Sequence, residues 1–282
     1  MRQALPTLNK HLARFAFALI VITTAGAIFY PFYWMIMASL QPEGASFARH
    51  TLFIPAGITG EAYINLLLRK PMMLWVFNTF LVTAASTAIV IPLALLAAYS
   101  ITRFRFRGRT GFIFSILLTQ LLPVTSLVIP LFLIFRTYKL LNTLGGVTIA
   151  YVTFLLPFTI WMLWGYLQTI PGDFEEAAMV DGCSRIGAFV RVTLPIAVPG
   201  LTAAALFAFL ESWNQYLLAF VLTSSESNWV VSLGLFSFTS EYVILVEQMM
   251  AASVIASIPA LLVFVTLQRF LRGGLALGGL RG

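Results

Sequence analysis

The sequence is poor in the residues that build disulfides, metal sites and charged surfaces. It has one cysteine and two histidines among 282 residues, which excludes an internal disulfide framework and leaves little for a metal site. Charged residues make up 10% of the chain, far below the roughly 25% of soluble domains. There is also no G-x-x-x-x-G-K-[ST] loop to cradle nucleotide phosphates, so the chain cannot itself be an ATP hydrolase.

Apolar sequence dominates what is present. The chain is 60% hydrophobic with a mean hydropathy of +0.94. It cannot hide that surface in one water-facing globule, so we interpret it as an integral membrane protein. Six charge-poor runs each exceed the ~20 residues that a helix needs to cross ~30 Å of hydrocarbon. The expected spans lie near residues 15–40, 72–101, 111–135, 147–169, 197–222 and 247–270.

The pattern of these runs indicates the fold class. They are apolar all round rather than alternating, which favours a helical bundle over a barrel. We therefore predict an all-α, polytopic membrane protein of about six transmembrane helices, in one domain over residues 1–282. The first run is too long for a secretory signal core, so we expect an uncleaved span. Five prolines fall within the expected spans and are expected to bend them: Pro92, Pro123, Pro130, Pro157 and Pro259.

Basic residues indicate the orientation. With the N-terminus inside, 12 of the 17 basic residues fall in cytoplasmic segments and five on the opposite side. This bias predicts that both termini are cytoplasmic. The arginines within 103–109 follow a span and are interpreted as a topology anchor. We expect contact with membrane lipid and no nucleic-acid partner.

One polar segment interrupts the apolar pattern, in a predicted cytoplasmic loop at residues 170–196. Asp173 is a candidate helix N-cap, and Glu176 three residues later completes a capping-box-like pairing. Ala177 and Ala178 keep one side of this short helix thin, so that another chain can approach closely.

A second short helix is predicted directly after it. Gly182 is placed to end the first helix, and Ser184 to cap a second one over residues 185–191. Pro195 and Pro199 are expected to break the chain before the next span. A small apolar face is expected from Phe174, Ala177, Ile186, Phe189 and Val190. The segment is interpreted as a docking element for a soluble partner, the alternative being a helix that rests on lipid headgroups.

These residues also carry a family resemblance. The segments Glu176-Ala177-Ala178, Asp181-Gly182 and Leu194-Pro195 resemble, in residues and spacing, the EAA motif of permease subunits of ABC importers. Other segments, in the expected order, resemble the second permease subunit of maltose-type carbohydrate systems. They are Pro31–Trp34, Ser39-Leu40, Phe77–Thr79, Ala97–Ser100 with Arg103-Phe104, Ile129–Leu131, Pro157–Trp161, Trp213-Asn214 and Gly274–Gly282.

The resemblance implies a type I ABC importer permease fold with a cytoplasmic EAA coupling helix, in a bacterial plasma (inner) membrane. It implies three kinds of partner: a second permease subunit, usually a related but distinct chain; two cytoplasmic ATP-binding subunits; and an extracytoplasmic solute-binding protein or lipoprotein. ATP and Mg would be bound by the ATPase subunits, and this chain would bind no cofactor or metal.

By the same resemblance, individual residues acquire expected roles. Glu176 would engage an ATPase arginine, Ala177 and Ala178 would pack in the ATPase cleft, and Gly182 is the turn glycine. The Gly-rich tail 274–282 resembles a family tail that enters the space between the ATPases, the alternative being an unstructured end.

A polar group inside the fifth expected span is the candidate substrate pathway. Glu211 is an intramembrane carboxylate, which is costly and therefore a functional-site candidate. Helical spacing places Glu211, Asn214 and Gln215 on one face that could recognise hydroxyls, while Trp213 could stack on a sugar ring. The alternative is hydrogen bonding that fixes the bundle. Weaker candidates are Asn78, Thr79, Thr83, Ser86, Thr87 and Tyr151.

The predicted function is a permease subunit, not an enzyme, for ATP-driven, binding-protein-dependent import of a sugar or oligosaccharide. One alternative is an importer of another solute, because the EAA loop does not encode the cargo. Another is an ATPase-independent carrier or channel, which should show charged relays or half-chain repeats in its spans; Glu211 alone fits that pattern. A scaffold subunit would fit the spans but not the EAA loop.

Overall fold

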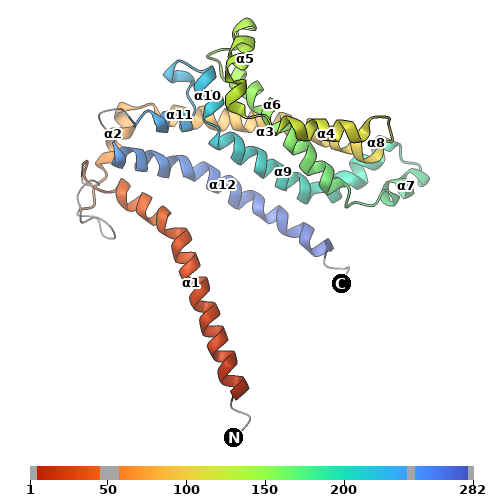
Figure 1. Ribbon diagram of the computed structural model, residues 1–282, viewed down its shortest axis with the longest axis horizontal. Helices are drawn as coiled ribbons and strands as arrows, with labels where there is room; N and C mark the ends of the chain where they lie inside the picture. Colours follow the sequence, from red (N-terminus) through yellow and green to blue (C-terminus); the bar gives the residue numbers. More distant parts are fainter. Residues whose placement is uncertain (1–4, 45–56, 240–244, 279–282) are drawn as a thin grey trace. The chain divides into compact units, whose positions relative to one another are not determined.

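The computed structural model describes residues 5–44, 57–239 and 245–278, and the side chains of residues 13–44, 57–239 and 245–270. The described chain is helical, which confirms the predicted fold class (Figure 1). Its helices are α1 (Leu5–Ser39), α2 (Glu61–Arg69), α3 (Met72–Arg103), α4 (Arg109–Thr119), α5 (Val124–Thr137), α6 (Leu144–Leu167), α7 (Asp173–Val180), α8 (Arg185–Ala188), α9 (Leu194–Asn214), α10 (Leu217–Leu222), α11 (Val231–Phe236) and α12 (Val246–Gly278).

Five of these helices are long and apolar enough to cross a membrane: α1, α3, α6, α9 and α12. The pair α4 and α5 adds a sixth span if its two helices count as one. The prediction of about six spans is confirmed in this sense. The tail predicted at 274–282 falls partly outside the described residues, since α12 remains helical to Gly278 and residues 279–282 are not described.

The third expected span, residues 111–135, consists of two helices rather than one continuous helix. Helices α4 and α5 are bent by 94° across residues 120–123. Pro123 stands at the N-cap of α5 with extended backbone. Proline has no N–H and disfavours helical backbone in the residue before it, so the helix ends before it and restarts after it.

The fifth span lies earlier than the expected residues 197–222. A membrane-length helical segment runs from Arg185 through α8, a π-helical turn (Phe189–Thr193) and α9 to Asn214. The chain therefore stays helical through Pro195 and Pro199, and the predicted break at these two prolines is wrong. Pro195 lies in the first turn of α9, where its missing N–H leaves no carbonyl of that helix unpaired. The π-helical turn before it realigns the hydrogen bonds.

Contacts divide the chain into two compact units, which are described separately. The first comprises residues 1–70 and 238–255, and the second residues 71–237 and 256–282. In the first unit, the most apolar stretch of α1 has no buried residue, as expected for a helix whose surroundings are lipid or another membrane chain. Glu43, after α1, accepts hydrogen bonds from Asn65 of α2 (2.8 Å) and Gln248 of α12 (2.7 Å).

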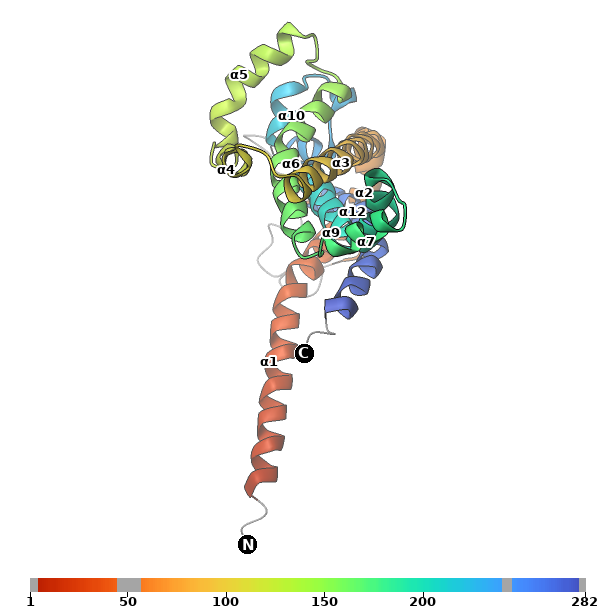
Figure 2. The same cartoon turned by 90° about the vertical axis from the view of Figure 1, so that its right-hand side faces the viewer.

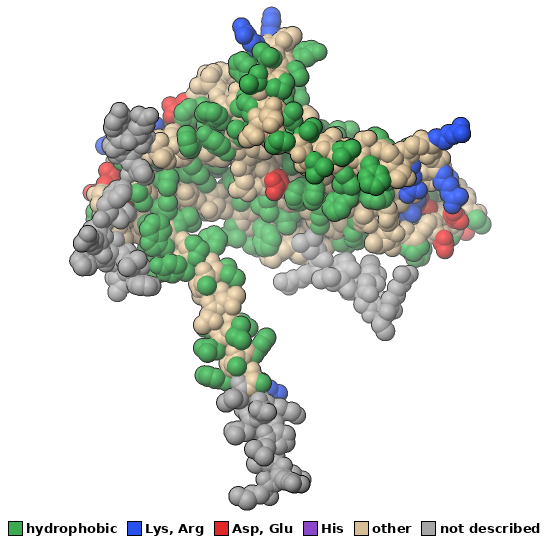
Figure 3. Space-filling model, in the orientation of Figure 1, with side chains coloured by type: hydrophobic (Ala, Val, Ile, Leu, Met, Phe, Trp, Pro, Cys, Tyr) green, Lys and Arg blue, Asp and Glu red, His purple; other side chains and the backbone are tan. Residues whose placement is uncertain are grey.

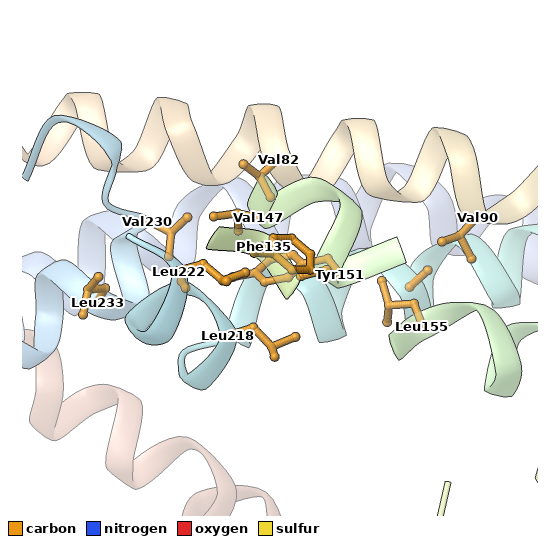
Figure 4. Packing of buried hydrophobic residues seen from close by; sticks show 13 residues of the cluster. Val82, Val90, Phe135, Val147, Tyr151, Leu155, Leu218, Leu222, Val230 and Leu233 are labelled. Atoms are coloured by element: carbon orange, nitrogen blue, oxygen red, sulfur yellow. The ribbon is translucent and has the colours of Figure 1, made fainter. Parts of the chain in front are cut away.

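The second unit is built around α3, α6 and α9, which pack against one another (Figures 1 and 2). One buried cluster lies toward α10 and α11, where Tyr151 packs among Phe135, Leu218 and Leu222 (Figure 4). A second cluster joins the ends of α3 and α6 to the start of α9. The α7–α8 segment thus follows the packed end of this bundle, and α10 and α11 lie near the other end.

Candidate functional site

Helix α7 ends at a glycine turn. Gly182 has a φ of +92°, a conformation that glycine adopts without strain. Its N–H donates to the Met179 carbonyl (3.1 Å), and the Cys183 N–H donates to the Ala178 carbonyl (3.0 Å). This pair of bonds is the Schellman motif that satisfies the last carbonyls of a helix. The predicted helix stop at Gly182 is confirmed.

The start of α7 differs from the prediction. Gly172 is the N-cap and makes no side-chain cap bond, whereas Asp173 is the first helical residue. The Glu176 N–H donates to the Gly172 carbonyl (3.1 Å), so the predicted capping box between Asp173 and Glu176 is wrong. Gly172 has helical backbone angles, and the helix therefore begins one position earlier than a side-chain cap at Asp173 would require. The acidic first turn still complements the helix dipole.

The second short helix begins as predicted. The Ser184 hydroxyl accepts a hydrogen bond from the Gly187 N–H (3.1 Å), which is the arrangement of a serine N-cap. The helix does not stop at residue 191 but continues through the π-helical turn into α9. The α7–α8 segment is therefore joined to the fifth span by helical backbone without a flexible linker.

The outer side of this segment is apolar as well as acidic. Val180 is 88% exposed, Ile186 77% and Phe174 53%. Together with Glu176 and Ala177, which are also exposed, these residues form what we call the α7–α8 face. Charged side chains also gather over α7 and α8 (Figure 3). Of the remaining EAA positions, Asp181, Gly182 and Pro195 are exposed, and Ala178 and Leu194 are half-buried.

The inner side of α7 carries a buried carboxylate. Glu175 is 4% exposed and accepts hydrogen bonds from the Tyr99 hydroxyl (2.8 Å), the Arg103 Nε (2.7 Å) and the Thr193 hydroxyl (2.5 Å). Arg103 also donates to the Ile170 carbonyl (3.1 Å). The cluster joins three elements: the end of α3, helix α7 and the π-helical turn before α9.

The hydrogen bonds of this cluster outweigh the cost of burial. Burial alone would raise the pKa of Glu175, but hydrogen bonds from Thr193, Tyr99 and Arg103, with the Arg103 charge, hold it below the ordinary value. Glu175 is therefore a carboxylate at neutral pH and pairs with the Arg103 guanidinium. A buried pair with its remaining hydrogen bonds satisfied fixes a geometry strictly.

This cluster is not predicted from the sequence. The sequence indicates a topology anchor at Arg103 and assigns Glu175 no role of its own. The adjacent carboxylates Glu175 and Glu176 could have indicated the cluster, because neighbouring residues on a helix face different directions. When Glu176 faces outward, Glu175 must face the body of the protein and requires a donor there.

The candidate pathway residues separate into two groups. Glu211, Gln215 and Tyr151 line one cavity of about 280 Å³, between the α4–α5 break, α6 and α9. Trp213 does not reach it: the ring is 5% exposed and stacks on Phe209 at 5.7 Å. Asn214 is exposed and its amide donates to the Leu210 carbonyl of its own helix (2.8 Å).

Asn78 has a structural role in the described chain. It is 3% exposed, and its amide donates to the carbonyls of Ser227 (2.8 Å) and Trp229 (3.0 Å). It thereby holds the segment before α11 on the first turns of α3. Asn78 therefore fits the second interpretation given for the polar residues of the spans, in which their hydrogen bonds fix the bundle.

A second asparagine organises the same end of the bundle. Asn142, in the turn before α6, accepts from the Ser224 and Ser225 N–H groups (3.1 and 2.9 Å) and donates to the Ser225 hydroxyl (2.8 Å). Its carbonyl accepts from the Asn228 amide (2.7 Å). The two loops therefore form one hydrogen-bonded surface.

Among the described residues, no group of three or more His, Cys, Asp or Glu side chains is placed to hold a metal ion. Two candidate sites remain: the exposed, acidic and apolar α7–α8 face, and the small cavity of polar and aromatic residues inside the bundle.

Known relatives share most of the length of this chain. It is 35% identical over 93% of its length to the diacetylchitobiose uptake system permease protein DasC of Streptomyces coelicolor, covering 95% of that protein. It is 32% identical over 89% of its length to the trehalose transport system permease protein SugB of Mycobacterium tuberculosis, covering 92% of that protein. These relatives are permease subunits, and this chain is likewise a transport subunit rather than an enzyme.

A solved structure has the same fold. A chain of a bacterial ABC transporter involved in the import of the acidic polysaccharide alginate matches with a TM-score of 0.76 and 24% identity, over 93% of this chain and 97% of that one. The sequence model of binding-protein-dependent transport system inner membrane components matches residues 90–276. The match includes α7, the glycine turn and the cavity residues. The chain therefore belongs to the family of binding-protein-dependent transport system inner membrane components, as a multi-pass permease of ABC importers.

Proposed function

We propose that this chain forms the membrane pathway of an ATP-driven sugar or oligosaccharide importer together with a second, related permease subunit. In this proposal residues 1–282 act as one transmembrane domain. The single observation that carries the proposal is the α7–α8 face. It holds the EAA residues Glu176 and Ala177 exposed, beside large apolar side chains that a soluble loop would not leave uncovered.

The α7–α8 face is the proposed docking site for one of the two cytoplasmic ATP-binding subunits, which would bind ATP and Mg. Glu176 offers a carboxylate to an arginine of the partner. Val180 and Ile186 offer apolar area around it, which excludes water from the pair. The helical connection from α8 to α9 would then pass movements of the partner to the fifth span.

The orientation follows from the docking proposal. If α7 meets cytoplasmic ATPases, Arg103 and Arg185 are cytoplasmic, in agreement with the bias of basic residues. Both chain termini then also lie in the cytoplasm. The surface organised by Asn142 faces outward, where an extracytoplasmic solute-binding protein or lipoprotein would deliver the cargo.

The sugar cargo is supported by the relatives. Their names include permeases for diacetylchitobiose, trehalose and trehalose/maltose. The cavity of aromatic walls with a few polar groups suits such molecules, because sugar rings have apolar faces and hydroxyl edges.

Charge reversal at Glu176 tests the proposal. The Glu176→Lys permease, expressed with its partner subunits, should insert normally but lose ATP-driven uptake at least about tenfold. Truncation of a buried interfacial charge pair typically costs about 2–5 kcal/mol. The readouts are uptake of labelled sugar and copurification of the ATP-binding subunit.

The matched control is Glu61→Lys, the same charge reversal at an exposed carboxylate of α2. It should leave uptake and copurification unchanged. Normal uptake by Glu176→Lys would refute docking at this face, and uptake that needs no ATP would indicate a secondary carrier instead.

A further inference from the structure

The cavity at Glu211 has the composition of a ligand site. Its volume of about 280 Å³ is close to the ~300 Å³ lower end of small-molecule sites, so it suits a single sugar residue. It is lined by Gln120, Val124, Tyr151, Phe154, Leu155, Phe158, Phe207, Glu211, Ser212 and Gln215. These residues come from the α4–α5 break, α6 and α9, so the proline break in the third span opens a wall of the cavity.

Aromatic rings form one part of the wall. Phe158 and Phe207 pack at 4.5 Å between ring centroids with their planes 38° apart. The Tyr151 hydroxyl donates to the Gln215 carbonyl (2.8 Å), so its polar atom is already paired. Tyr151 is 2% exposed and forms part of the cavity wall from within the core. Flat apolar surfaces of this kind pack against the C–H faces of pyranose rings.

The polar groups of the cavity include one that has no partner. The Ser212 hydroxyl is buried, with the residue 2% exposed, and it makes no hydrogen bond within the described chain. Buried polar groups are nearly always paired, and an unpaired one indicates an unseen ligand or water. Ser212 lines the cavity next to Glu211, so the unpaired hydroxyl belongs to a residue of the cavity wall.

The charge of the cavity restricts the ligand. Glu211 is the one Asp, Glu, Lys, Arg or His among the ten lining residues. Its carboxylate accepts hydrogen bonds from hydroxyls and repels anions, and no lining cation offsets that repulsion. Glu211 is exposed rather than buried in the described chain, so a ligand that enters the cavity meets this side chain directly.

We propose that this cavity binds one residue of a neutral saccharide, with Glu211 and Ser212 hydrogen-bonded to its hydroxyls, and rejects uronic acids and sulfonated sugars. The inference rests on the proposed function, because it assigns a cargo class to the pathway. It also distinguishes this chain from systems that carry acidic sugars, such as the alginate importer whose fold it shares.

Saturation-transfer NMR on the purified, complete transporter tests this inference. The solute-binding protein is omitted, so that its own selectivity does not decide the result. The probes are maltose, trehalose, diacetylchitobiose and digalacturonate. At least one neutral probe should receive saturation from the wild-type transporter, and digalacturonate should not.

Two variants then test the named residues. Glu211→Gln should weaken neutral-saccharide binding about five- to tenfold and allow a digalacturonate signal, because the repelling charge is gone. Glu61→Gln, an equal change outside the cavity, should match the wild type. Ser212→Ala should also weaken binding several-fold without lowering thermal stability, since its hydroxyl has no partner in the described fold.

Three outcomes would overturn the inference: no signal from any neutral probe, equal signals from maltose and digalacturonate in the wild type, or Glu211→Gln and Ser212→Ala variants that bind as the wild type does. Failure of the proposed function has a different signature, because the ATP-binding subunits would then not copurify and uptake would not require ATP. If only the cavity assignment fails, ATP-driven uptake persists while the Glu211 variant keeps the wild-type selectivity.

Discussion

Glu175 and Glu176 are adjacent on α7 and have opposite surroundings. Glu175 is 4% exposed and accepts three side-chain hydrogen bonds. Glu176 is exposed and belongs to the α7–α8 face. One carboxylate therefore fastens the helix to the ends of α3 and α9, and its neighbour is available to a partner. Because these hydrogen bonds hold α7 to α3 and α9, the three helices would move together when a partner displaces α7.

Removal of the inner charge should loosen α7. Glu175→Gln replaces the carboxylate that pairs with Arg103, and a lost hydrogen bond to a charged group costs about 1.5–3 kcal/mol. We expect faster amide hydrogen exchange across residues 173–193 in the purified permease. Glu176→Gln, on the exposed side, should leave that exchange unchanged. Equal protection in the two variants would contradict a fastening role for Glu175.

The same pair predicts a pH dependence. The pKa of Glu175 is lowered from its ordinary value of 4.5. A lowered pKa in the folded state stabilises the fold above the ordinary value, and the stabilisation is lost as pH falls through the lowered pKa. The melting-temperature difference between wild type and Glu175→Gln should therefore be full near neutral pH and shrink below about pH 4.5. A difference that grows in acid would have the wrong sign for this carboxylate.

At the scale of elements, helices α6 and α9 approach each other closely at a glycine. A methyl group on Gly200 would lie 2.3 Å from the Tyr166 ring. Gly200→Ala should therefore push the two helices apart and lower the stability by about 1–3 kcal/mol. Thermal unfolding in detergent measures this change.

Gly165, also on α6, provides the matched control. A methyl group there meets nothing within 4 Å, and alanine is the better helix former by about 1 kcal/mol. Gly165→Ala should thus raise the melting temperature while Gly200→Ala lowers it. A stabilising Gly200→Ala would mean that Tyr166 moves aside at little cost.

The elements were predictable where the signal is local. Charge-free apolar runs located the spans, since any membrane helix must pair its backbone groups internally. Pro123 indicated the bend of the third span but not its 94° angle, because the angle depends on packing. The π-helical turn at residues 189–193 was not predicted, since its hydrogen bonds shift by one residue without any change in composition.

In the candidate site, too, local features were predictable from the sequence and features that depend on packing were not. Gly182 and Ser184 were predicted correctly, because each pairs with a backbone group three positions away. The donors to Glu175 from α3 lie 72 and 76 positions away in the sequence. Only the packing of α7 against α3 brings them together, so composition and spacing could not reveal them.

At the scale of the whole molecule, exposed apolar surface occurs in two settings. Side chains of α1 such as Phe15 (70% exposed) and Phe17 (69%) lie on a membrane-length helix, where lipid or a second permease subunit would cover them. Val180 and Ile186 flank the glycine turn between α7 and α8. In our orientation they lie at or before the cytoplasmic start of the helical segment Arg185–Asn214, whose 30 residues exceed the ~20 that cross the hydrocarbon. The hydrocarbon core therefore does not cover them, and a protein partner is needed.

Ile186→Ser tests this assignment. If Ile186 (77% exposed) is buried by an ATP-binding subunit, its loss removes apolar burial worth about 1.5–3 kcal/mol, or about tenfold or more in affinity. Titration of ATP-binding subunits onto the purified permease pair measures the effect. Ile58→Ser is the control, because Ile58 is equally exposed at 77% but lies before α2. Equal affinity in both variants would contradict burial of Ile186 by an ATP-binding subunit.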